Sequence, residues 1–101
     1  MKTEEKYIGK CFKLIYGCPY FIPELQEVVK FTNPNLAVRI TNLVGDEPAF
    51  GNLIRIGLGP FMTDDETNIT IELNSSKLGP EYEFNDKETI FYMDFNYPQN
   101  K

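Results

Sequence analysis

The sequence lacks the side chains that most often carry hydrolytic or transfer chemistry. Among its 101 residues there is no histidine, and the only serines are Ser75 and Ser76. Histidine is the usual acid or base near neutral pH, and a hydrolase serine often lies in a Gly-x-Ser-x-Gly motif, which does not occur here. A GxxxxGK phosphate-binding loop is absent as well. We therefore expect a protein that is not an enzyme and that needs no cofactor.

Cysteine is also scarce, because Cys11 and Cys18 are the only two. Along an extended strand their α-carbons would lie about 23 Å apart, whereas a disulfide requires roughly 4.4 to 6.8 Å. A usual zinc site needs four Cys or His ligands, which a single chain of this composition cannot supply. We expect two reduced, structural thiols, with a disulfide or a reactive thiol as the alternatives.

Long apolar runs are missing too. No stretch approaches the ~20 apolar residues that a transmembrane helix needs, and the start, MKTEEKYIGK, contains no apolar signal-peptide core. The sequence thus predicts a cytoplasmic protein without a membrane partner. Its richness in Ile, Asn, Lys, Phe, Tyr and Glu suits an AT-rich bacterial or phage gene.

The residues that are present are ample for one hydrophobic core. Apolar residues make up 42% of the chain and aromatic residues 14%, which excludes a disordered chain. The length is that of a common single domain, which buries roughly two thirds of the surface of its unfolded chain. We expect one domain over residues 1–101.

Alternating apolar and polar residues recur in six runs along the chain. The runs are 7–16, 36–41, 53–58, 69–74, 81–84 and 91–97. Clusters of Gly, Pro, Asn and Asp separate them, and such alternation between turns is typical of β-strands with one buried face. The sequence therefore predicts an all-β fold, either a small antiparallel barrel or a compact sandwich of five to six strands. The rhythm is SH3-like by analogy only.

Residues 23–30, PELQEVVK, are the ambiguous segment. A proline at the first helical position and apolar residues at helical spacing would form one short helix. The β-branched residues instead favour a strand over 28–32 that pairs with 36–41 after a turn. We prefer the strand, and a short helix or 3₁₀ turn stays open for residues 23–27.

Carboxylates are the only plentiful reactive groups. Glu81 and Glu83 would project from one strand face about 7 Å apart, a spacing that invites comparison with glycosidases. Asp64, Asp65 and Glu66 form an acidic loop of the kind that can contribute to a calcium or magnesium site. However, alternation makes the first pair the solvent face of a strand, and the loop lacks the spacing of a calcium-binding motif. The sequence therefore predicts neither catalytic residues nor a metal site.

Charge is divided unevenly along the chain, whose net charge is −5. Residues 1–42 carry six Lys or Arg against four Glu, whereas residues 43–101 carry four against eleven Asp or Glu. A negative second half can steer a basic partner, and it disfavours duplex nucleic acid, which needs a basic patch. We therefore predict an acidic surface that binds a basic protein surface. Its residues are Asp64, Asp65, Glu66, Glu72, Glu81, Glu83, Asp86, Glu88 and Asp94.

In its sharpest form this function is that of an inhibitor, which imitates the charge of nucleic acid and blocks a nucleic-acid-binding protein. The competing interpretation is ordinary solubility, because a net charge of this size is usual for a small soluble domain.

Aromatic residues offer a second candidate contact surface. One group, Tyr16, Tyr20 and Phe21, surrounds Pro19 in a predicted loop. The other consists of Ile90 and Tyr92, on the strand face opposite Phe91, Met93, Phe95 and Tyr97. Exposed apolar groups of this kind mark interfaces, although both groups could also fold into the core.

Two further function classes stay open. Small β-barrels bind single-stranded nucleic acid by stacking bases on aromatic residues in a basic groove, and the mildly basic first half contains three tyrosines. These are Tyr7, Tyr16 and Tyr20, with Lys6, Lys10, Lys13 and Arg39. The other class is a structural subunit that pairs its sheet edges with copies of itself, which would make the protein a homo-oligomer.

Overall fold

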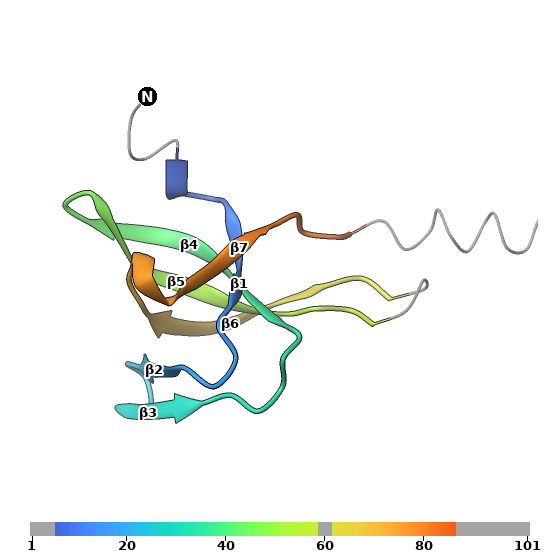
Figure 1. The fold of residues 1–101 in the computed structure, drawn as a ribbon, viewed down its shortest axis with the longest axis horizontal. Coiled ribbons are helices and arrows are strands. Elements are labelled where there is room, and N and C mark those ends of the chain that lie inside the picture. The colour runs from blue at the N-terminus through green and yellow to red at the C-terminus, as the bar shows by residue number, and fades with distance from the viewer. Residues whose placement is uncertain (1–5, 59–61, 87–101) are drawn as a thin grey trace, which may run out of the picture.

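The computed structural model describes residues 6–58 and 62–86, and within them the chain is almost entirely β-structure. The seven strands of these residues are β1 (Cys11–Leu14), β2 (Pro19–Ile22), β3 (Glu27–Lys30), β4 (Leu36–Val44), β5 (Glu47–Arg55), β6 (Asp65–Glu72) and β7 (Leu78–Tyr82). A 3₁₀ turn, η1 (Ser75–Lys77), lies between β6 and β7 (Figure 1). No helix among the described residues is long and apolar enough to cross a membrane.

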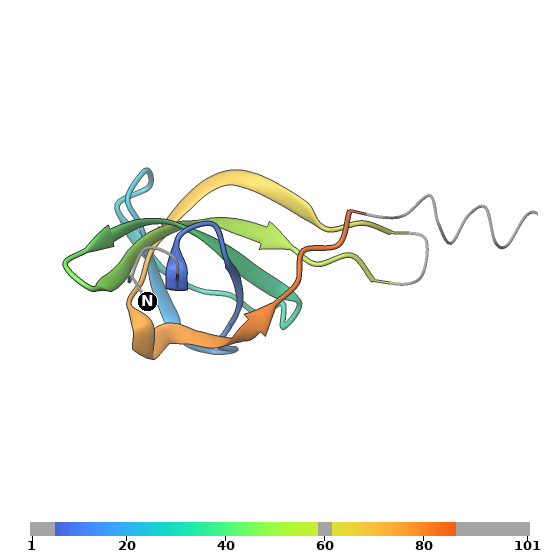
Figure 2. The ribbon, with the colours of Figure 1, turned by 90° about the horizontal axis from the view of Figure 1, so that it is seen from above.

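The strands form one sheet in the order β3-β2-β6-β5-β4-β1-β7, and every neighbouring pair is antiparallel. Two perpendicular views show that the sheet curls into a half-barrel (Figure 1, Figure 2). The predicted all-β fold of the small-barrel type is therefore confirmed. The described residues contain seven strands where five to six were expected.

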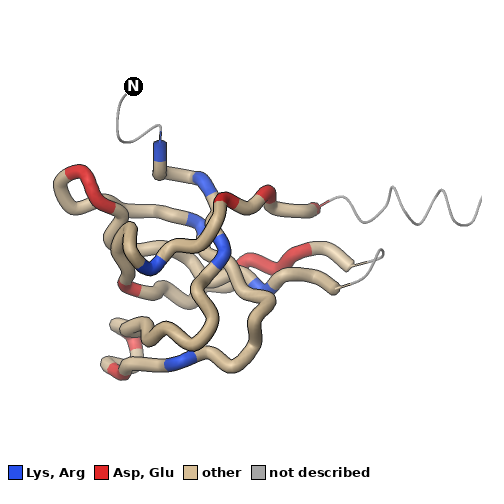
Figure 3. Tube along the Cα trace, viewed as in Figure 1, with Lys and Arg blue, Asp and Glu red and all other residues tan. Residues whose placement is uncertain are grey.

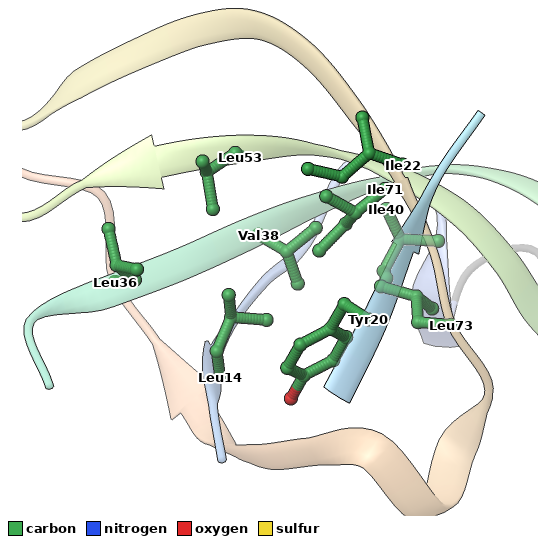
Figure 4. Packing of buried hydrophobic residues seen from close by; sticks show 9 residues of the cluster. All are labelled: Leu14, Tyr20, Ile22, Leu36, Val38, Ile40, Leu53, Ile71 and Leu73. Atoms are coloured by element: carbon green, nitrogen blue, oxygen red, sulfur yellow. The ribbon is translucent and has the colours of Figure 1, made fainter. Parts of the chain in front are cut away.

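The concave face of the sheet holds the main core. Successive residues of a strand point to opposite faces, so Val38 and Ile40 of β4 meet Leu53 of β5 and Ile71 of β6 (Figure 4). Each fully buried aliphatic side chain of this kind stabilises the fold by ~1.5–3 kcal/mol relative to an exposed one. The cluster consists of Leu14, Tyr20, Ile22, Leu36, Val38, Ile40, Leu53, Ile71 and Leu73.

Two glycines set the geometry of the β4–β5 hairpin. Gly45 and Asp46 form its two-residue turn, where Gly45 has a φ of +63° that glycine adopts without steric cost. Farther along β5, a Cβ atom on Gly51 would lie 2.5 Å from Cγ2 of Val38 and 2.6 Å from the carbonyl oxygen of Arg39. Only glycine lets β5 approach β4 this closely at that point.

Residues 23–30 contain no helix, and their strand pairs differently from the prediction. The carbonyl oxygen of Ile22 accepts hydrogen bonds from the N–H groups of Leu25 at 3.1 Å and Gln26 at 2.8 Å, which closes a tight turn. This turn brings β3 back along β2. The predicted pairing with residues 36–41 is wrong because β1 and β5 occupy both edges of β4.

Candidate functional site

The convex face of the sheet, opposite the main core, is partly covered by residues 82–84, at the end of β7 and just after it. A second buried cluster lies on this face, and Tyr82 and Phe84 pack against it. This cluster consists of Cys11, Ala37 and Ile54. Arg39 borders the covered region, because its Cζ lies 5.1 Å from the centroid of the Phe84 ring.

Asp64, one of the residues predicted to form the acidic surface, is buried, with an exposed fraction of 6%. Its carboxylate accepts hydrogen bonds from the N–H of Gly57 at 2.8 Å, the hydroxyl of Tyr82 at 2.6 Å and the N–H of Asn85 at 2.8 Å. A carboxylate with three donors can be buried without leaving its charge uncompensated. The prediction is wrong for this residue, which ties the β5–β6 connection to the chain after β7.

Three other acids of the predicted surface are paired with cations. The pairs are Glu66 with Arg39 at 3.0 Å, Asp65 with Arg55, and Glu81 with Lys10 at 4.0 Å. Opposite charges this close cancel much of each other's field in solution. Acidic residues are also spread over several separate segments, with lysines and arginines between them (Figure 3). The described acids therefore do not form one continuous negative surface.

Glu72, Glu83 and Asp86 are exposed, and none of them forms an ion pair with another described residue. Glu88 and Asp94 lie outside the described residues, so their place in the predicted surface stays a prediction. The three exposed acids differ in their surroundings, because only Glu72 lies in the middle of the sheet.

Glu72 lies between two phenylalanines on the convex face. It is the register partner of Phe21 in β2 and of Phe50 in β5. Directly opposed residues of antiparallel strands point to the same face with Cβ atoms ~4.5–5.5 Å apart, so these side chains form a row across the sheet. Val28, the partner of Phe21, extends the row to the edge strand β3. We call Val28, Phe21, Glu72 and Phe50 the contact row.

The contact row is accessible to solvent. The sequence neighbours of Glu72, Ile71 and Leu73, are buried in the main core, so the Glu72 side chain points outward. Phe21 and Phe50 are half-buried, and Val28 is 65% exposed. Apolar side chains thus flank an exposed carboxylate on the convex face.

The predicted aromatic patch is only partly present. Tyr16 is 65% exposed, and Phe21 belongs to the contact row. The prediction is wrong for Tyr20, which is 1% exposed because its position in β2 directs the ring into the main core (Figure 4). Ile90 and Tyr92 lie outside the described residues.

Both cysteines are free thiols. Cys11 is buried in β1, and burial raises the pKa of its thiol above the ordinary value, an effect that the nearby Arg39 guanidinium opposes. Cys18 is half-buried before β2, and its Sγ donates to the carbonyl oxygen of Pro19 at 3.7 Å. A catalytic thiol usually has a lowered pKa, which is the opposite of what Cys11 shows.

The described residues form no metal site. No group of three or more Cys, Asp or Glu within residues 6–58 and 62–86 is arranged to hold a metal ion. Burial and the hydrogen bond to Asp64 raise the pKa of Tyr82 to about 12, and this hydrogen bond joins the last residue of β7 to the β5–β6 connection.

No protein-family model, curated protein or solved structure matches this chain. The contacts, burial and charges of the described residues are therefore the basis for a functional proposal. Sequence reasoning named Phe21 and Glu72 but missed Val28 and Phe50 as site residues. Alternation shows which residues of one strand share a face, whereas the identity of the adjacent strands depends on the sheet order.

Proposed function

We propose that this domain is a protein-binding module that acts in the cytoplasm and does not catalyse a reaction. The observation that supports this proposal is the contact row, in which apolar side chains flank an exposed carboxylate near a sheet edge. Protein interfaces combine apolar and aromatic contacts with a small number of charged groups, and the energy concentrates in a few residues. Two free thiols suit the reducing cytoplasm.

Binding through the contact row differs from the imitation of nucleic acid that the charge distribution suggested. An imitation of that kind needs a regular array of unpaired carboxylates that stand in for phosphates. In the structure Asp64 is buried, while Asp65, Glu66 and Glu81 have cationic partners. The proposed partner therefore contacts a mixed apolar and charged surface, and it need not be a protein that binds nucleic acid.

A groove for single-stranded nucleic acid has less support from the same contacts. Tyr20 is buried, and Tyr7 is half-buried with its ring centroid 6.1 Å from that of Phe12, so neither ring is fully free to stack on a base. Tyr16 alone of the three tyrosines is largely exposed. One stacking platform is a poor basis for a binding groove that follows several nucleotides.

Site-specific photocrosslinking in cells of the native organism tests the proposed function. A benzophenone amino acid replaces Val28 in one version of the full chain and Val44 in another. Val44 is the matched control for Val28. Val28 is 65% exposed, and Val44 is 69% exposed at the turn end of the β4–β5 hairpin. We expect one discrete crosslinked protein from position 28, its loss when Phe21→Ser is added, and no such product from position 44.

Three results would overturn the proposed function. Identical products from both positions would show nonspecific contact, and no product from position 28 would show that the contact row is unoccupied. A product that contains only this chain would indicate self-assembly instead of binding to a different protein.

A further inference from the structure

Glu72 is the exposed acid of β6 that has no cationic partner among the described residues. Of the other two acids of the strand, Asp65 is paired with Arg55 of the adjacent strand β5, and Glu66 is paired with Arg39 of β4, one strand farther away. Two of the three carboxylates of this strand are therefore in ion pairs, and the third is not. The difference identifies Glu72 as the carboxylate of this strand that is available to a cation from outside.

The chain itself contains a filled site of the same chemistry. The guanidinium of Arg39 donates from Nε to Oε1 of Glu66 at 3.0 Å, and its Cζ lies 5.1 Å from the ring centroid of Phe84. Its Nη1 also donates to the carbonyl oxygen of Gly9 at 2.9 Å. A carboxylate and an aromatic ring thus hold one guanidinium together on the convex face.

The contact row provides the same two kinds of group without a cation. Phe21 and Phe50 are the direct register neighbours of Glu72, one on each side. A guanidinium can pair with a carboxylate and stack on an aromatic face at the same time, because it is planar and weakly hydrated. An ammonium is a compact, strongly hydrated charge and gains less from a half-buried aromatic ring.

The chain has no arginine left for this position. Its two arginines are Arg39 and Arg55, and both are engaged in ion pairs. A second copy of the chain carries the same two arginines in the same pairs. An arginine of a second copy would first have to leave its own ion pair, which favours an arginine of a different protein.

We propose that the contact row receives an arginine side chain of the partner protein. The guanidinium pairs with the carboxylate of Glu72 and lies against the rings of Phe21 and Phe50, while Val28 contacts an apolar neighbour of that arginine. This inference rests on the proposed function and names the chemistry of the partner at that site.

A titration of the ¹⁵N-labelled full chain with short peptides, followed by NMR, tests this inference. The probes are acetyl-Leu-Arg-Leu-amide, the same peptide with lysine, and the same peptide with citrulline, which is nearly isosteric with arginine but neutral. We expect the arginine peptide to shift the amide signals of the contact row and to bind roughly tenfold more tightly than the citrulline peptide. The lysine peptide should bind with intermediate affinity.

Two variants distinguish binding at Glu72 from general attraction of the peptide to the negative charge of the protein. Glu72→Gln should reduce affinity for the arginine peptide roughly tenfold, because it removes the charge and keeps the shape of the side chain. Glu83→Gln removes one exposed carboxylate elsewhere and should leave the affinity unchanged. The spectra of the free variants report whether each remains folded.

Three outcomes would overturn the inference: equal affinity for the arginine and citrulline peptides, equal losses in the two variants, or shifts that cluster away from the contact row. If any of these outcomes occurred together with a specific crosslink from position 28, the protein-binding proposal would stand. Only the inference that the partner contributes an arginine would be rejected. Failure of the crosslinking experiment instead removes the proposed function itself.

Discussion

The hydroxyl of Tyr20 donates a hydrogen bond of 2.7 Å to the carbonyl oxygen of Lys77, 57 residues farther along the chain. The same hydroxyl accepts a hydrogen bond of 2.9 Å from the N–H of Ile15. Lys77 completes the connection, because its Nζ donates to the carbonyl oxygen of Pro19 at 2.7 Å. Side-chain contacts thus join β2 to η1, the turn that leads into β7, and no strand ladder connects β2 with β7.

Replacement of Tyr20 by phenylalanine should lower the free energy of unfolding by about 1–3 kcal/mol. The ring can still fill the core, but the Lys77 carbonyl and the Ile15 N–H lose their partner in a partly buried place. Urea denaturation followed by circular dichroism measures the change. Tyr16→Phe is the matched control, because Tyr16 is 65% exposed and its variant should differ from wild type by less than about 0.5 kcal/mol. Equal effects of the two variants would contradict the bridging role.

Replacement of Asp64 by alanine should destabilise the protein far more than replacement of the adjacent Asp65. Loss of the Asp64 carboxylate leaves the Tyr82 hydroxyl and two backbone N–H groups without an acceptor, which costs about 3 kcal/mol or more. Asp65→Ala removes an exposed ion pair with Arg55 and should cost about 1 kcal/mol or less. Chemical denaturation of the two variants side by side provides the measurement. Similar losses would show that the buried carboxylate is not a tertiary link.

Stability should fall as the pH rises above about 9. Burial raises the pKa of the Cys11 thiol from 9.0 and of the Tyr20 hydroxyl from 10.0, and it raises the pKa of Tyr82 to about 12. A raised folded-state pKa means that the unfolded chain releases its proton first, so the stabilisation is complete below the unfolded pKa. For Tyr82 it is lost between about pH 10 and pH 12.

The variant Tyr82→Phe isolates this contribution. Its stability should fall less steeply than that of wild type between pH 10 and pH 12, because it lacks the titrating Tyr82 hydroxyl that donates to Asp64. Denaturation midpoints measured across this range supply the slopes. Parallel curves for the two proteins would exclude Tyr82 as a source of the pH dependence.

The two thiols should react at different rates with a thiol reagent such as DTNB. Cys11 has an exposed fraction of 4%, and burial raises the pKa of its thiol, so little reactive thiolate reaches the reagent. Cys18 is only half-buried and should react first in the folded protein. A Cys18→Ser variant should therefore show almost no fast phase until denaturant is added. A fast phase of full amplitude in that variant would contradict the burial of Cys11.

Much of the strand structure follows from local pattern. The predicted runs 36–41, 53–58 and 69–74 overlap β4, β5 and β6, because a long strand with one buried face must alternate. The short strands β2 and β3 were harder to predict. Each has only four residues and lies next to proline-bearing turns, so tertiary pairing decides its conformation more than local preference does.

The two adjacent acids Asp64 and Asp65 show what the local sequence pattern cannot predict. Asp64 and Asp65 are adjacent and identical in type, yet one accepts three internal hydrogen bonds and the other is exposed beside Arg55. The three donors that allow the Asp64 carboxylate to be buried belong to Gly57, Tyr82 and Asn85, which only the folded chain brings together. No property of the dipeptide distinguishes its two carboxylates.

Residue types and their local spacing are enough to show an acidic, mostly β chain that has no histidine. Composition and alternation are sufficient for these conclusions, since each depends on residue type and local spacing. Which charges are paired and which side chains share a surface depends on the folded chain. Phe21, Phe50 and Glu72 become neighbours because β2 and β5 both pair with β6, and a sheet order made of distant segments leaves no local signal.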